Sequence, residues 1–370
     1  MTISESLKSS LLKYKENEPL AKHSTMRVGD KADFFVEIHF EEDLKSFLNL
    51  YKDYTDLPLL ILGEGSNTLF SDGFRGIVLQ MVNKGIEKID EDNEFVTLKA
   101  SAGQNWHEFV KYCVDNNLSG VENLAFIPGT IGAAPVQNIA AYGQVQEDAF
   151  LSLEAFEISS AEKRTFDEPE CQFDYRSSIF KNELKDKYII SSVTYKLKKA
   201  SEYIPETSYH SRYESLGGIL EEVAQEPYTL KDIFHAVIEI RKRKLPQVKD
   251  YGTLGSFFVN HFITTEKLKE LQDKFPDIQY YPVDKMQYPA LEDQSLKDAE
   301  FVKIPVGWLL EELGWKGKMI GNVGTYEKHA LCVITDGPAT GQEVIDYMNK
   351  MKQSVFDATG IEITSEVNIV

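Results

Sequence analysis

The stretch "IPGTIGAAPVQNIAAYG", residues 127–143, consists of small, apolar and amide residues without a single charge. It lies in a run from Asn123 to Gln146 that contains no Asp, Glu, Lys or Arg, although 27% of the chain is charged. Glycine permits close backbone approach, and alanine leaves backbone groups accessible. The segment could therefore line a groove for a large ligand with polar edges. A tightly packed core crossing requires the same small residues, so the residues alone leave both interpretations open.

A second glycine-rich segment, "GEGSNTL" at residues 63–69, follows an apolar run that predicts a short buried strand at 58–62. A Rossmann turn requires G-x-G-x-x-G and then a helix, but Thr68 occupies the third glycine position and "LFSDG" reads as a turn. No phosphate-binding G-x-x-x-x-G-K-[ST] motif occurs. Clustered backbone N–H groups in this segment could still bind phosphate oxygens. A plain tight turn is the alternative.

The bulk composition restricts the partners. The chain has 370 residues and a net charge of −19, which argues against nucleic acid or an anionic membrane as a partner. Its three cysteines are far apart and form no CxxC pair, which fits a reducing cytoplasm and argues against disulfides or a zinc site. No signal-peptide or membrane-spanning stretch is visible. The histidines lack metal-ligand spacing, so we expect no catalytic metal.

Hydrophobic periodicity predicts an α+β protein in two parts. The likeliest seam is the polar, tyrosine-rich stretch at 200–218, which divides the chain into 1–200 and 201–370. The first part is expected to hold two subdomains, about 1–72 and 73–200. Predicted strands are 32–38, 58–62, 76–82, 94–101, 151–158, 188–199, 331–335 and 365–370. Predicted helices are 41–54, 105–117, 229–244 with Thr229 as N-cap, 264–275, 306–313 and 341–360.

Five motifs then come in a specific order: "GEGSNTLF", "ENLAFIPGTIGAAPVQNIAAYG", "YRSSIFK", "GSFFVN" and a closing "SEVNIV". Together they resemble the UDP-N-acetylenolpyruvoylglucosamine reductases, and the likeness covers about residues 20–370. These flavoenzymes complete UDP-N-acetylmuramic acid in peptidoglycan synthesis. The resemblance implies a vanillyl-alcohol-oxidase-type (PCMH-type) FAD-binding fold at 1–200, which has no Rossmann fingerprint. It also implies an α+β substrate-binding domain at 201–370, whose C-terminal strand returns to the active site.

The resemblance implies non-covalent FAD and NADPH as co-substrate. Covalently flavinylated oxidases of this fold use a His or Cys tether, and residues 123–146 contain neither. The implied FAD-binding residues are Gly63, Glu64, Gly65, Ser66, Asn67, Thr68, Leu69, Pro128, Gly129, Thr130, Gly132, Ala133, Gln137, Asn138, Ala141, Tyr142 and Gly143.

The family's reaction needs a stabiliser of enolate charge and a proton donor. NADPH reduces FAD, which gives hydride to C3 of an enolpyruvyl ether while C2 takes a proton. The resemblance implies that Arg176 in "DYRSSIF" stabilises the enolate, that Ser256 in "GSFFVN" donates the proton, and that Glu366 in "SEVNIV" assists near C2. The family usually has Pro before this Glu and a basic residue after the Val, where this chain has Ser365 and Asn368.

The resemblance implies a small nucleotide-sugar as the substrate and four residues that bind it. Lys244, in the basic run "RKRK", would reach the diphosphate, although a solvated helix face is the alternative for that run. Asn260 and His329 lie at further substrate-facing motif positions. Tyr209 would be the loop tyrosine of the type I branch, with Tyr213 as the alternative.

The family precedent is a cytoplasmic monomer. Two rival functions stay open: another FAD oxidoreductase of the same fold, and a nucleotide-binding protein without catalysis. The second is disfavoured because Arg176, Ser256 and Glu366 occur together, which binding alone would not require. Bleaching of a bound flavin by NADPH would discriminate against it.

Overall fold

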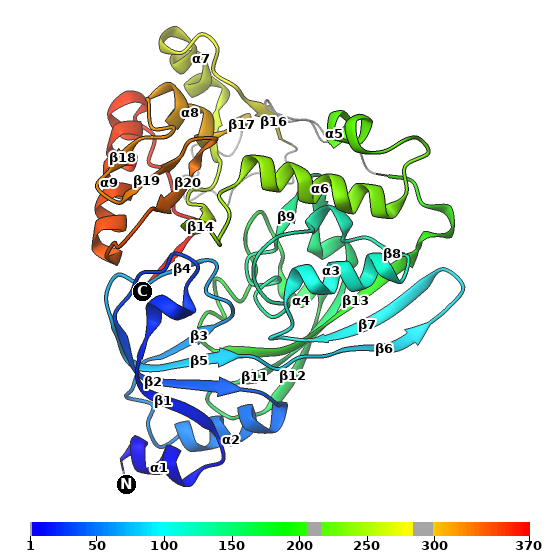
Figure 1. Cartoon of the computed structure of the whole chain (residues 1–370), viewed down its shortest axis with the longest axis vertical. Helices are drawn as coiled ribbons and strands as arrows, with labels where there is room; N and C mark the ends of the chain where they lie inside the picture. Colours follow the sequence, from blue (N-terminus) through cyan, green and yellow to red (C-terminus); the bar gives the residue numbers. More distant parts are fainter. Residues whose placement is uncertain (1, 206–215, 284–298) are drawn as a thin grey trace. The chain divides into compact units, whose positions relative to one another are not determined.

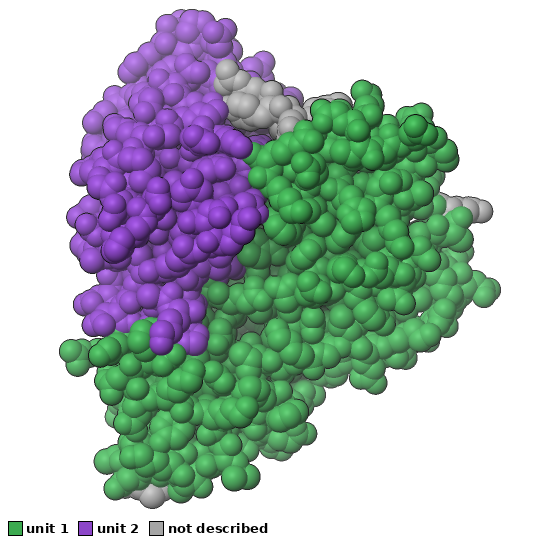
Figure 2. Space-filling view, in the orientation of Figure 1, with its two compact units in different colours: residues 1–19, 31–65, 73–243 green, residues 20–30, 66–72, 244–370 purple. Residues whose placement is uncertain are grey.

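The computed structural model describes residues 2–205, 216–283 and 299–370, so the predicted Tyr209 and its alternative Tyr213 lie outside the described residues. The chain divides into two compact units (Figure 2). Unit 1 comprises Met1–Pro19, Lys31–Gly65 and Gly73–Arg243, and unit 2 comprises Leu20–Asp30, Ser66–Asp72 and Lys244–Val370.

The first sheet of unit 1 has the strand order β1-β2-β5-β3 (Figure 1). Its strands are β1 (Lys13–Pro19), β2 (Lys31–Ile38), β5 (Phe74–Met81) and β3 (Leu59–Leu62), and the helices beside them in sequence are α1 (Ile3–Ser9) and α2 (Glu41–Tyr51). β5 runs parallel to both β2 and β3. The central strands are rich in apolar residues, as expected of buried parallel strands.

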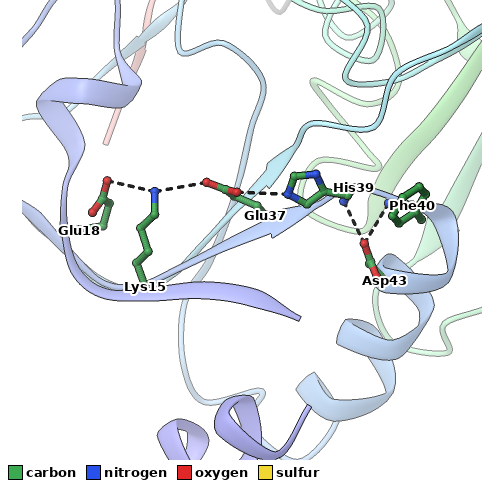
Figure 3. A network of polar contacts seen from close by, with 6 residues as sticks. All are labelled: Lys15, Glu18, Glu37, His39, Phe40 and Asp43. Carbon is green, nitrogen blue, oxygen red and sulfur yellow. Dashed lines mark hydrogen bonds and ion pairs between the residues drawn. The ribbon is translucent and has the colours of Figure 1, made fainter. Parts of the chain in front are cut away.

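A polar network holds the beginning of α2 against the first two strands (Figure 3). Lys15 on β1 pairs with Glu37 on β2 at 3.3 Å, and Glu37 also contacts His39 at 3.2 Å. The Asp43 carboxylate accepts hydrogen bonds from the backbone N–H groups of His39 (3.1 Å) and Phe40 (3.0 Å). Polar groups that the first helical turn leaves unsatisfied are partly satisfied in this way. The ion pairs are partly exposed and contribute little to stability.

The second sheet of unit 1 is antiparallel, with the order β12-β11-β13-β7-β6 and with β8 paired to β13. Its strands are β6 (Ile86–Glu91), β7 (Phe95–Ser101), β8 (Leu118–Ser119), β11 (Phe150–Glu157), β12 (Lys163–Asp167) and β13 (Tyr188–Lys199). Helix α3 (Trp106–Asp115) buries an apolar face on it, with the Trp106 and Tyr195 rings 5.8 Å apart. A short helix, α4 (Glu168–Cys171), follows β12.

One hydrophobic core joins both sheets to α5 (Leu216–Val223) and α6 (Leu230–Lys244). The ring of Phe234 on α6 stacks on His107 of α3 at 5.6 Å. The unit boundary therefore falls between Arg243 and Lys244 and not in the predicted seam at 200–218. The predicted subdomain boundary at residue 72 does not separate two bodies either. β5, which follows that residue, belongs to the first sheet, and both sheets share one core. Thr229 accepts a hydrogen bond from Asp232 N–H at 3.3 Å, as the predicted N-cap should.

Unit 2 is built on two antiparallel sheets, β14-β20-β19-β18 and β15-β17-β16, and its core contains Trp308, Tyr347 and Met351. The strands are β14 (Gly252–Ser256), β15 (His261–Thr264), β16 (Tyr281–Pro282), β17 (Phe301–Ile304), β18 (Met319–Ile320), β19 (Val323–Tyr326) and β20 (His329–Thr335). The helices are α7 (Thr265–Lys274), α8 (Val306–Glu312) and α9 (Gly341–Thr359).

The C-terminal strand is shorter than predicted. β21 (Asn368–Ile369) pairs in parallel with β4 (Thr68–Leu69), which places the end of the chain beside the segment that follows the glycines. Among the described residues, no helix is long and apolar enough to cross a membrane.

Candidate active site

The structure brings the two glycine-rich segments together within unit 1. A Cβ on Gly63 would lie 2.8 Å from Oγ1 of Thr130, so the Thr130 side chain packs directly against the glycine. The Glu64 carboxylate accepts hydrogen bonds from Gly129 N–H at 3.1 Å and from Nδ2 of Asn105 at 2.7 Å. The expected cofactor residues at 63–65 and 128–133 therefore form one surface, which Glu64 holds together.

Apart from the Glu64 carboxylate, this surface is uncharged, and part of it is solvent-accessible. Pro128 and Ala133 are exposed, while Gly63 and Gly132 are half-buried. Gly132 also serves packing, because its N–H donates to Ala102 O at 2.8 Å and an added Cβ would lie 2.7 Å from the Ala102 Cβ. The packing interpretation of the opening stretch therefore applies to Gly132, and the groove interpretation stays a prediction for the exposed residues. An accessible strip of small residues with free approach to the backbone fits a flat cofactor that carries a pyrophosphate.

The later part of the stretch is a small hairpin. β9 (Ala140–Ala141) pairs with β10 (Gln144–Val145). The two residues between them, Tyr142 and Gly143, both have positive φ, at 49° and 86°. A two-residue hairpin of this geometry is the type I′ turn, which favours glycine. The hairpin explains why a glycine ends the quoted stretch.

Arg176 lies on a tight turn that meets this hairpin. Asp174 and Ser177 exchange backbone hydrogen bonds, both of 3.1 Å, with Arg176 between them at a φ of 54°. Its Nη2 donates to the carbonyl of Ala140 at 2.8 Å. The Asp174 carboxylate accepts from the N–H of Tyr175 at 2.6 Å, which stabilises the turn. The half-buried guanidinium is thus placed beside the uncharged stretch.

Ser256 and Glu366 lie on neighbouring segments of unit 2. Ser256 ends β14 directly after Gly255, which has a φ of +72° at a register irregularity opposite β20. Such bulges redirect the following side chain. Among the described residues, the half-buried Ser256 hydroxyl has no hydrogen-bond partner. Glu366 N–H donates to Phe257 O at 2.9 Å, and Asn67 Nδ2 donates to Glu366 O at 3.2 Å.

The expected substrate residues Lys244 and His329 also lie near each other in unit 2. Burial, and then the positive charges of Lys244 and Lys316, lower the pKa of His329 to about 3. The ring is therefore neutral near pH 7, and its Nδ1 accepts from Leu331 N–H at 3.2 Å. The proton of the neutral ring is left on Nε2 as a donor. Sequence patterns did not identify Lys316, because it belongs to no motif and a lysine in a turn is common.

The remaining members of the basic run have structural partners. Arg241 Nε donates to Phe126 O at 3.0 Å, and Arg243 pairs with Glu239 and Glu222, both at 2.9 Å. The basic run is therefore divided between the two units, and Lys244 is its one member in unit 2. The side chain of Asn260 accepts from Val306 N–H, at the start of α8, at 3.3 Å.

The predicted site residues divide between the units. Unit 1 holds Arg176 and the expected cofactor residues at 63–65 and 128–143, while unit 2 holds 66–69, Lys244, Ser256, Asn260, His329 and Glu366. Across the described ranges, no group of three or more His, Cys, Asp or Glu side chains is placed to bind a metal ion.

Comparisons with known proteins agree with this geometry. Residues 32–160 match the family described as FAD binding domain, and residues 247–370 match that described as UDP-N-acetylenolpyruvoylglucosamine reductase, C-terminal domain. The UDP-N-acetylenolpyruvoylglucosamine reductase of Flavobacterium johnsoniae is 40% identical over 363 residues, covering 97% of this chain and 100% of its own. That of Aliivibrio fischeri is 35% identical over 355 residues, covering 95% of this chain and 93% of its own.

A solved structure confirms the fold. The crystal structure of the UDP-N-acetylenolpyruvylglucosamine reductase from Thermus caldophilus matches with a TM-score of 0.61 and 20% identity, covering 97% of this chain and 98% of that one. The predicted fold class is therefore confirmed, with FAD-binding and substrate-binding parts. On the full-length identity to its curated relatives, this chain belongs to the UDP-N-acetylenolpyruvoylglucosamine reductase family.

Proposed function

We propose that Arg176, Ser256 and Glu366 carry the chemistry by which this chain reduces UDP-N-acetylglucosamine enolpyruvate to UDP-N-acetylmuramate. Family membership makes the chain an FAD-dependent, NADPH-linked oxidoreductase of peptidoglycan precursor synthesis. The observation that best supports the residue assignment is the hydrogen bond from Glu366 N–H to Phe257 O, at 2.9 Å. It puts the expected acid and the expected carboxylate on adjacent segments, although more than a hundred residues separate them in sequence.

The proposal assigns FAD to the uncharged strip. When bound, FAD supplies a hydride to C3 of the substrate after it has been reduced by NADPH. The residues that would hold it non-covalently are those of 63–69 and 128–143. Ala133 is small and exposed, Gly63 leaves room for the Thr130 side chain, and Glu64 holds the two segments together. The positive φ of Gly65 and Gly129, 64° and 132°, supports glycine at both positions.

Arg176 would hold the substrate carboxylate and stabilise the negative charge that develops beside it. A planar guanidinium can bind a carboxylate through two parallel hydrogen bonds, and it stays charged at any working pH. The hydrogen bond from its Nη2 to the Ala140 carbonyl restrains the guanidinium. Fixing this cation before the reaction is what electrostatic stabilisation of an enolate requires.

Ser256 would deliver the proton to C2, with Glu366 assisting. An isolated serine is a weak acid, so a directed hydroxyl and neighbouring charged groups are needed. The bulge at Gly255 and the adjacency of Glu366 support that assignment. Lys244, Asn260 and His329 would bind the substrate's diphosphate and sugar, since a lysine and a neutral histidine supply N–H donors in an otherwise acidic protein. Tyr209, outside the described residues, is proposed as the loop tyrosine.

The proposal extends to a monomer in the cytoplasm. The cysteines Cys113, Cys171 and Cys332 are all buried and none forms a disulfide, which suits a reducing compartment. Sedimentation of the FAD-loaded protein tests the monomer.

The test of the acid assignment is Ser256→Ala, followed by anaerobic stopped-flow absorbance of the flavin. We expect NADPH to reduce the flavin at nearly the wild-type rate, since that step transfers no proton to substrate. Reoxidation by the enolpyruvyl substrate should slow by about 10²–10⁴-fold, the range for loss of a positioned acid. Ser256→Cys should recover part of the rate, because a thiol can donate from a similar position. Equal slowing of both steps would make Ser256 structural.

A further inference from the structure

A buried chain of hydrogen bonds in unit 1 ends at the turn that carries Arg176. The Tyr195 hydroxyl donates to Oε1 of Gln146 at 3.2 Å, and Nε2 of Gln146 donates to Oδ1 of Asn138 at 3.0 Å. Nδ2 of Asn138 then donates to the carbonyl of Asp174, the first residue of the turn, at 3.3 Å. Tyr195 and Gln146 are 0% exposed and Asn138 is 4% exposed, so water cannot replace these partners.

The direction of this chain is fixed by its acceptors. Asn138 Nδ2 faces the Asp174 carbonyl and also the carboxylate of Glu147, at 2.8 Å. Both of these groups can only accept, so the amide nitrogen of Asn138 must point to them and its oxygen must point to Gln146. Gln146 must therefore donate to Asn138, and its own oxygen must accept from Tyr195. A side chain at 146 that cannot donate would break the order.

Gln146 also fixes the second attachment of Arg176. Its backbone N–H donates to Ile139 O at 3.0 Å and closes the hairpin at 138–146. Ala140, whose carbonyl accepts from the Arg176 guanidinium, lies inside that hairpin. The backbone of the turn and the side chain of Arg176 are thus both held by a segment that Gln146 anchors.

The backbone of Arg176 needs such support. Its φ of 54° and the φ of 44° at Asn138 lie in the left-handed region, which disfavours residues other than glycine. A strained conformation of this kind persists only where its surroundings hold it. The Asn138 hydrogen bond to the turn is one such restraint.

We infer that Gln146 is a positioning residue for Arg176: through Asn138 it sets the turn that aims the guanidinium at the substrate. The inference rests on the proposed role of Arg176 in the oxidative half-reaction. A role in folding alone would instead affect FAD binding, stability and both half-reactions together. The rates of flavin reduction and of flavin reoxidation can be measured separately, so their comparison distinguishes a positioning role from a role in stability.

The test uses Gln146→Glu, which keeps the shape of the side chain, accepts from Tyr195 and, when ionised, cannot donate to Asn138. In the FAD-loaded enzyme, we expect flavin reduction by NADPH within about twofold of wild type. Reoxidation by the enolpyruvyl substrate should slow by about 10- to 100-fold, the scale for a catalytic group displaced by about 1 Å. Ser191→Ala is the control, because it also removes a buried hydroxyl from β13, the strand that carries Tyr195. In the described chain, the Ser191 hydroxyl forms a hydrogen bond only with the Glu154 carbonyl. It should leave both steps unchanged.

A double-mutant comparison makes the outcome specific. If Gln146 acts through Arg176, Gln146→Glu should add less than about twofold in an Arg176→Ala background. Two results would overturn the inference about Gln146 but leave the proposed role of Arg176 intact. One is equal slowing of both half-reactions by Gln146→Glu, and the other is a double variant in which the two single-substitution effects on reoxidation multiply. If the flavin of Arg176→Ala is reoxidised by the substrate at the wild-type rate, the proposed role of Arg176 is wrong, and the inference about Gln146 is wrong with it. If Gln146→Glu does not fold, Tyr195→Phe decides, since it removes the donor to Gln146. We expect the same split between half-reactions at several-fold, and no split would reject the inference.

Discussion

Gly132→Ala gives a sharp test of how the uncharged stretch is packed. A Cβ at this position would lie 2.7 Å from the Ala102 Cβ, 3.2 Å from its Cα and 3.3 Å from its carbonyl oxygen. Non-bonded carbon atoms are best separated by about 3.5–4.0 Å, so the two backbones must part by about 1 Å. Neither can move freely, because Gly132 N–H donates to Ala102 O at 2.8 Å and Ala102 N–H donates to Ser191 O at 2.9 Å.

Overpacking of this kind costs about 1–3 kcal/mol, which corresponds to a fall in Tm of about 2–12 °C for a unit of this size. A shift of about 1 Å in the cofactor strip should also reduce turnover by up to about 10²-fold. Thermal unfolding measures the change in Tm, steady-state oxidation of NADPH measures turnover, and the ratio of flavin to protein absorbance measures FAD content. We expect a lower Tm together with a lower FAD content.

Gly217→Ala is the matched control. Gly217 lies in α5, and an added Cβ would meet no described residue within 4 Å. Alanine in a helix is favoured over glycine by up to about 1 kcal/mol, so this variant should be as stable as wild type or more so, with full FAD content. If Gly132→Ala has the Tm and FAD content of Gly217→Ala, the close packing of the stretch is not what requires glycine.

Two further predictions concern the substrate residues. Lys244→Ala should raise KM for the nucleotide-sugar more than it slows flavin reduction by NADPH, and an unchanged KM would return the whole basic run to a solvated helix face. His329 has a pKa of about 3 in the folded protein, against about 6.5 when unfolded. Between these values the unfolded chain binds the extra proton, so stability should fall as pH drops from 6.5 toward 3. Urea unfolding at pH 7 and pH 5 should show a smaller loss in His329→Asn, and an identical loss would contradict a neutral His329.

Much of the fold could be predicted from local patterns. The strands at 32–38 and 188–199 and the helices at 229–244 and 341–360 appear close to their predicted bounds, because their hydrophobic periodicity and caps are strong. The absence of a Rossmann motif at 63–69 was also predicted from the sequence, and Thr68 indeed lies in a short strand, β4, and does not begin a helix.

What could not be predicted depends on contacts distant in sequence. Residues 66–72 join unit 2 because β4 pairs with β21 at the other end of the chain. Helix α6 joins unit 1 through its side-chain packing, although the polar stretch before it resembled a seam. A two-residue pairing and a shared core leave no periodic signal in the sequence.

The site residues show the same division. Motifs identified Arg176 and Ser256, but not the conformations that orient them. The left-handed backbone of Arg176 and the bulge at Gly255 arise from pairing with other segments. The buried chain through Gln146 gave no signal either, because a glutamine in an uncharged stretch could equally face a ligand.

The most direct test of the central claim is an anaerobic double-mixing experiment on the wild-type protein. NADPH is added first and one equivalent of UDP-N-acetylglucosamine enolpyruvate second, while flavin absorbance is followed and the product is identified by mass. We expect NADPH to bleach the flavin, and the substrate to restore its absorbance with formation of one equivalent of UDP-N-acetylmuramate. A flavin that NADPH does not bleach, or that stays reduced when the substrate is added, would contradict it.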